Sequence, residues 1–199
     1  MRLVSFLAFL SFFCCGQNKK DKLACSEFNM RGVEGLQTFK NSRDSSALLK
    51  SLYFFDKAIE CDPTNAINYQ NKLIVLNQLS RLREALKVID KVYELSDGKD
   101  VKLLVSKGII YERLTQLDSS SLWYNKAFQK YSEQLERHTP DSIRIIGDRL
   151  YLTAIMEGKD SAMEKLKPYL SKYPNDSTLK LYEDLLQQFD RKVIIPVGR

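Results

Sequence analysis

Two consecutive stretches of the chain repeat one pattern of apolar and polar positions. Within residues 64–131, large apolar residues recur seven positions apart, and after a short break a small residue is followed by large ones four and seven positions later. This spacing places the apolar residues on one face of each of two helices. A hairpin of this length cannot bury both faces alone, so we expect copies to stack on one another. The matched positions, 35 residues apart, are Tyr69 and Leu104, Leu76 and Tyr111, Leu82 and Leu117, Ala85 and Ser120, Ile89 and Tyr124, and Val92 and Ala127.

The second copy carries the fuller pattern. Gly108 and Tyr111 lie in its first segment, and Ser120, Tyr124 and Ala127 follow as small, aromatic and small residues in its second. This arrangement resembles the tetratricopeptide repeat, and the resemblance covers roughly residues 45–174. It implies stacked helical hairpins, and it says little about a ligand because the pattern residues are packing residues. Further matches are Pro63, Tyr69 and Ala85; the departures are Lys72, Leu73, Val92 and Lys107.

The fold predicted from these patterns is all-α, an α-solenoid of about four tetratricopeptide-like helix hairpins with a C-terminal capping helix. Thr139 and Pro140 are expected to open the fourth hairpin, with the proline at the first helical position. The small–aromatic–small spacing recurs after 42 residues instead of 35, and the seven extra residues correspond to two helical turns. We therefore predict that the second helix of the third hairpin extends to about Arg137. The expected units are hairpins at about 24–63, 64–97, 98–131 and 140–174, a capping helix at 176–190, and a tail at 191–199 whose apolar residues lie along the last helix.

The first 15 residues indicate the compartment. Arg2 precedes an apolar run from Leu3 to Phe13 that is too short to span a bilayer, which needs about 20 residues. The run ends at Cys14 and Cys15 and resembles a bacterial lipoprotein signal, whose cysteine is lipidated and becomes the mature N-terminus. Cys15 is the expected acceptor, residues 16–23 are expected to form a tether, and an ordinary cleaved signal is the alternative. The lipoprotein interpretation predicts a bacterial envelope protein that faces the periplasm or the cell surface.

Charge and chemistry narrow the function classes. The net charge of +6 comes from basic residues interspersed with acids, without the basic stripe and interleaved aromatic residues typical of nucleic-acid binding. The single histidine, His138, has no second histidine and no paired cysteines at ligand spacing. No phosphate-binding loop or nucleophile elbow is present. We therefore predict a non-enzymatic protein without metal or cofactor and without a nucleic-acid partner.

Two cysteines of the mature chain leave two possibilities open. Cys25 and Cys61 lie at the start of the first helix and at the end of the second, which are adjacent in an antiparallel pair. In an oxidising compartment they could form a disulfide. The alternative is a pair of free thiols acting as small apolar side chains.

The leading functional hypothesis is a membrane-anchored scaffold that holds a protein or peptide partner. Arrays of this type present the first helix of each hairpin on a concave face, and the repeat register assigns eight residues to it. Their mixture of apolar and amide groups suits an extended peptide or a helix. The alternative is an enzyme or enzyme subunit in envelope polymer metabolism. The predicted partner-binding residues are Ile67, Gln70, Ile74, Asn77, Lys102, Val105, Ile109 and Glu112.

Overall fold

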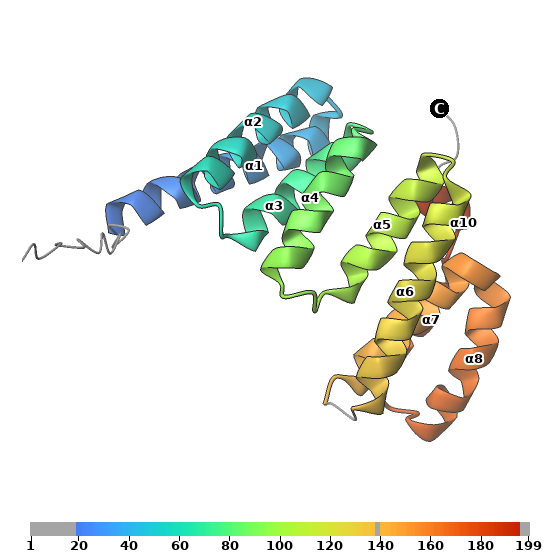
Figure 1. The fold of residues 1–199 in the computed structure, drawn as a ribbon. Coiled ribbons are helices and arrows are strands. Elements are labelled where there is room, and N and C mark those ends of the chain that lie inside the picture. The colour runs from blue at the N-terminus through green and yellow to red at the C-terminus, as the bar shows by residue number, and fades with distance from the viewer. Residues whose placement is uncertain (1–18, 138–139, 196–199) are drawn as a thin grey trace, which may run out of the picture.

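The computed structural model describes residues 19–137 and 140–195, and within these ranges the regular structure is entirely helical. Figure 1 shows the helices following one another along a curved array, with α1 at one end and α8 at the other. In chain order the helices are α1 (Lys19–Ser42), α2 (Ser45–Cys61), α3 (Ala66–Gln78), α4 (Leu82–Leu95), α5 (Val101–Arg113), α6 (Leu117–Glu136), α7 (Ser142–Glu157), α8 (Lys159–Lys172), α9 (Ser177–Gln187) and the short α10 (Arg191–Ile194).

Five helices begin at a side chain that caps them. The capping residues stand just before their helices and accept hydrogen bonds from the first free backbone N–H groups; they are Asp44, Asn65, Asp100, Asp176 and Asp190. These acceptors stabilise the ends at which helix donors have no intrahelical partner. Short polar sequences therefore set where α2, α3, α5 and α9 start, and with them the phase of each apolar face.

The hairpins pack through small residues set against rings. Ala127 is fully buried, and Tyr124 retains only 5% of its exposure. A methyl group added at Gly108 would overlap the ring of Tyr124, so only glycine allows α5 and α6 to lie this close. Gly32 faces Phe55 in the same way, between α1 and α2. The predicted packing role of the pattern residues is confirmed.

The four predicted hairpins and the helix that follows them are present in the described residues, whereas α10 was not predicted and two boundaries are wrong. α1 is helical from Lys19, so the expected tether is largely part of the first helix. Pro140 lies in a turn before α7, which starts at Ser142 after Asp141, so it is not the first helical residue. The extension of the third hairpin is correct, since α6 ends at Glu136. The proposed lipidation residue Cys15, and His138, lie outside the described residues.

The C-terminal tail does not follow the prediction that it lies along the last helix. Ile195 is 1% exposed and belongs to the apolar cluster built by α5, α6 and α7, together with half-buried Phe189 and Ile194. The chain thus turns back after α9 and packs α10 beside the third and fourth hairpins (Figure 1).

Candidate functional site

The α3 part of the predicted face is open. Ile67 and Ile74 are 57% and 49% exposed, and Gln70 is exposed between them. Ile74 and Gln78 line a depression of about 280 Å³ between α1 and α3. Its remaining lining residues, all from α1 and the turn after it, are Val33, Leu36, Gln37, Phe39, Lys40 and Arg43.

One predicted residue of α3 is already engaged. Asn77 is half-buried, and its Oδ1 accepts a hydrogen bond at 3.4 Å from Nη1 of Arg113 on α5. Asn71 also lies on α3, and its Nδ2 donates a hydrogen bond of 2.9 Å to Oδ1 of Asn29 on α1. These amide groups link α3 to its neighbours α1 and α5, so the exposed isoleucines lie on a helix that is held on both sides.

The α5 part of the predicted face is largely covered. Val105 and Ile109 are half-buried and pack against the same apolar cluster as Ile195. Nζ of Lys102 lies 3.1 Å from Oδ1 of Asp148 on α7. Val105 and Ile109 are therefore less accessible than Ile67 and Ile74, and their assignment to the binding surface stays a prediction.

Glu112 also has a structural environment. It is 7% exposed, its carboxylate accepts a hydrogen bond from the Tyr124 hydroxyl at 3.0 Å, and it forms an ion pair with Arg191 of α10. Burial, followed by the nearby Glu112 carboxylate, raises the pKa of Tyr124 well above its usual value. In this structure Arg191 occupies the position in which a partner would meet Glu112, so direct contact between Glu112 and a partner stays a prediction.

A second charged cluster was not predicted. The side chain of Asp148 is 9% exposed and lies beside Lys102 and Arg144, and it accepts a hydrogen bond from the hydroxyl of Tyr182 on α9. Burial, followed by this hydrogen bond, raises the pKa of Tyr182. The cluster joins α5, α7 and α9. Arg144 lies one helical turn from Asp148, but Lys102 and Tyr182 are too far from it in the chain for repeat spacing to reveal them.

The basic residues that depart from the repeat pattern have a common structural role. Nζ of Lys72 on α3 lies 2.5 Å from Asp56 on α2, and Nζ of Lys107 on α5 lies 2.5 Å from Asp90 on α4. Lys107 also lies 3.8 Å from the ring centroid of Trp123. Each lysine therefore ties a first helix to the hairpin before it. The 35-residue spacing of Lys72 and Lys107 was the available signal.

The structure joins Cys25 and Cys61 in a disulfide, with their Cα atoms 5.4 Å apart. The bond links α1 to the last residue of α2 and closes the first hairpin at that end. Of the two possibilities left open above, the geometry is that of the bonded one. Oxidation of this pair in the isolated protein stays a prediction.

The described residues contain neither a candidate metal site nor a candidate membrane span. No group of three or more histidine, cysteine or acidic residues is placed to hold a metal ion within 19–137 and 140–195. Over the same ranges, no helix combines the length and apolar character that crossing a membrane requires.

Comparison with known proteins identifies the repeat. The family model of the tetratricopeptide repeat matches residues 54–87, which run from α2 through α3 into α4. Residues 54–87 are therefore similar to one tetratricopeptide repeat unit. The all-α, repeated-hairpin architecture extends that unit on both sides, and the matched repeat contains the open α3 face with Ile67 and Ile74.

Two individual proteins are similar to this chain at low identity. RNA polymerase-associated protein CTR9 of Saccharomyces cerevisiae is 23% identical over 143 residues, which are 70% of this chain and 13% of that protein. A tetratricopeptide repeat protein from Parabacteroides merdae is 17% identical with a TM-score of 0.43, covering 79% of this chain and 59% of that one. This chain thus spans a small part of the first and somewhat over half of the second.

Proposed function

We propose that this protein is a non-enzymatic scaffold that binds a protein partner on the open surface of α1 and α3, and that a lipid on Cys15 holds it at a membrane outside the cytoplasm. The observation that carries the binding proposal is the exposure of Ile67 and Ile74 at the centre of a tetratricopeptide repeat. Aliphatic side chains exposed together mark interaction surfaces more often than scattered ones do.

The surroundings of this surface suggest the chemistry of the partner. Ile74 forms one wall of the depression between α1 and α3, whose other apolar walls include Val33 and Phe39. Lys40 and Arg43 are exposed at its edge. A protein segment with aliphatic side chains and a neighbouring acidic residue would therefore meet apolar walls and a basic rim.

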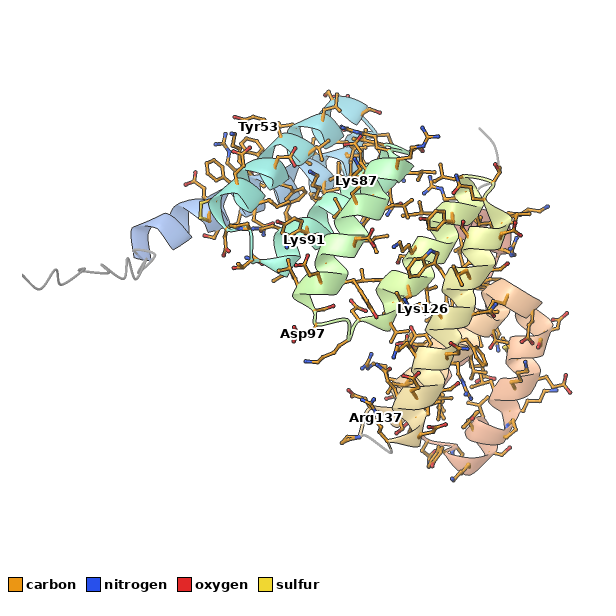
Figure 2. All side chains as sticks on the ribbon, in the orientation of Figure 1. Tyr53, Lys87, Lys91, Asp97, Lys126 and Arg137 are labelled. Atoms are coloured by element: carbon orange, nitrogen blue, oxygen red, sulfur yellow. A yellow bond between two sulfur atoms is a disulfide. The ribbon has the colours of Figure 1, made fainter. Side chains whose placement is uncertain are left out.

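Capture from detergent-solubilised membranes tests the binding surface. Ile67→Ser with Ile74→Ser should abolish capture of the partner while leaving the melting temperature nearly unchanged, because exposed substitutions usually cost under about 0.5 kcal/mol each. Lys87→Ala with Lys126→Ala is the matched control on the second helices, where Figure 2 shows both lysines on the outer side of α4 and α6. Loss of capture with the lysine variant, but not with the isoleucine variant, would contradict the proposed surface.

The anchor has a separate test. The lipoprotein-type sequence up to Cys15 supports it, and Cys15→Ala should release the protein from the membrane fraction or block its processing. Intact mass of the mature protein should include the acyl chains. A mature protein without lipid would refute the anchor and leave the binding surface to be judged by the capture experiment.

A further inference from the structure

The C-terminal segment 190–195 is seated between two first helices of the array. Arg191 reaches α5 through its ion pair with Glu112 and reaches α7 through a hydrogen bond of 3.1 Å from Nε to the carbonyl oxygen of Ile155. Ile155 lies in the last turn of α7, where helix carbonyls lack partners within the helix. One guanidinium therefore satisfies a buried carboxylate and a helix end that are supplied by different hairpins.

A second anchor lies four residues further along the segment. Ile195 is 1% exposed and belongs to the same cluster as Val101 and Leu104 of α5. Between the anchors, Lys192 and Val193 face solvent, and Val193 is 76% exposed. The segment is thus held by Arg191 and Ile195, and half-buried Ile194 packs against the same apolar cluster.

We call the surface of α5 and α7 on which the segment lies the α5–α7 groove. This groove continues past the segment. A depression of about 280 Å³ adjoins the Glu112–Arg191 pair, with Tyr124 and Asn125 among its lining residues. Leu117 and Met156 line it as well and are 63% and 39% exposed. A longer ligand that contained the same two anchors would gain apolar contact here that the chain's own segment does not make.

The preceding repeat shows what makes this groove specific. Asn77, 35 residues before Glu112, is an amide that accepts from Arg113, and it offers no buried negative charge. Glu112 supplies that charge, and a buried carboxylate requires a cationic or hydrogen-bonding partner. When the segment leaves, the Tyr124 hydroxyl still bonds Glu112 but the charge loses its cation.

We propose that the α5–α7 groove is a docking site for a partner segment that carries an arginine followed four residues later by a β-branched aliphatic residue, and that residues 190–195 occupy it in cis until such a segment displaces them. The seating of the tail is independent of the proposed function, whereas its replacement by a partner rests on the scaffold role. A tethered segment acts at a high effective concentration. A partner must therefore bind more tightly than the chain's own tail.

A labelled peptide with the sequence of residues 190–195, acetylated and amidated, tests the site on the full chain. Arg191→Ala with Ile195→Ser should free the groove, and fluorescence anisotropy should show binding at least tenfold tighter than to the unaltered chain. Lys192→Ala with Val193→Ser is the matched control, because both side chains face solvent and the tail should stay seated. A peptide with alanine in place of its arginine should not bind the freed groove. Equal binding by all three chains, or equal binding of both peptides, would overturn the proposal.

Hydrogen exchange gives a second readout that does not need the double variant to fold. The N–H groups of Val193 and Ile195 are bonded to the carbonyl oxygens of Asp190 and Arg191, so they should be protected in the unaltered chain. Glu112→Gln should speed their exchange at least tenfold and leave α1 and α2 unchanged. Rapid exchange of these N–H groups in the unaltered chain would refute the cis seating. So would a dimer, detected by light scattering, that becomes a monomer in the Arg191→Ala, Ile195→Ser variant. Neither result depends on Ile67 or Ile74, so failure here is distinguishable from failure of the scaffold surface.

Discussion

Equivalent positions in two neighbouring repeats have different environments. Ile74 on α3 is 49% exposed, whereas Ile109, 35 residues later on α5, is half-buried in a cluster that includes Ile195. Asn77 binds an arginine weakly at 3.4 Å, whereas Glu112 is buried and paired with Arg191. The repeat register gives both pairs the same place on their helices. What differs is the segment that lies across them.

The two halves of the array are also held in different ways. The first hairpin is closed by the Cys25–Cys61 disulfide, and its neighbour leaves a hydrophobic surface open. The last hairpins are held by ion pairs that centre on Asp148 and Glu112 and by the returning tail. In a repeat array each unit mainly contacts its neighbours, so a covalent cross-link in the first hairpin mainly stabilises that end of the array. The comparison therefore predicts local responses to local changes.

Loss of the disulfide should have the largest effect. Reduction removes the closure of the 36-residue span between Cys25 and Cys61, worth about 3–4 kcal/mol in the chain-entropy model. Chemical denaturation with and without reductant measures the change, and hydrogen exchange should show lost protection in α1 and α2 but not in α7 to α9. Cys25→Ser with Cys61→Ser is the control, since reductant should no longer matter. Superimposable curves for the unaltered chain would show that no bond is present.

Overpacking of the third hairpin should cause the second-largest loss of stability. Ala127 is fully buried in the cluster formed by α5, α6 and α7, so Ala127→Leu should lower the free energy of unfolding by about 1–3 kcal/mol. Gln129→Leu on the exposed side of the same helix adds similar bulk and should change little. Urea denaturation of both variants gives the comparison. A neutral Ala127→Leu would mean that α5 and α6 can separate without cost.

The packing of each hairpin was predictable from sequence because it depends on local spacing. Residues on one face of a helix recur about every 3.6 positions, so the spacing of Gly108, Tyr124 and Ala127 predicts that they pack between helices. The length of α6 followed from the same arithmetic. Pro140 was misplaced because a turn and a first helical position suit proline equally well.

The candidate site was predicted only in part, because exposure depends on contacts between distant residues. Glu112 and Arg191 are 79 residues apart, and nothing in the sequence around Arg191 marks it as the partner of a buried carboxylate. A first-helix residue is free only if no later segment returns to cover it. Ile67 and Ile74 remain exposed, whereas Val105, Ile109 and Glu112 are covered.

High pH should act on the C-terminal half. Tyr124, Tyr131 and Tyr182 all have raised pKa values, mainly because burial disfavours their charged forms. An unfolded tyrosine loses its proton near pH 10 while the folded one keeps it, so stability is full below pH 10 and falls as pH rises. Each tyrosine should cost about 1 kcal/mol between pH 10 and 11.

Denaturation at pH 9, 10 and 11 measures this loss. Tyr182→Phe removes one titrating group and should flatten the pH dependence, even though it leaves Asp148 without that hydrogen bond at every pH. A stability that rises with pH over this range would contradict the direction of the shifts.

The matched isoleucines give the smallest and most direct contrast. Ile109→Ala removes atoms packed against the apolar cluster of α5, α6, α7 and Ile195 and should cost about 1 kcal/mol, since the side chain is only half-buried. Ile74→Ala at the same place in the preceding repeat should cost under about 0.5 kcal/mol, because its side chain already meets solvent. Both variants need only thermal and urea unfolding. If the two costs are equal, the apolar cluster does not cover Ile109 in solution. If Ile74→Ala costs more, another part of the chain covers α3 and the surface proposed for the partner is not free.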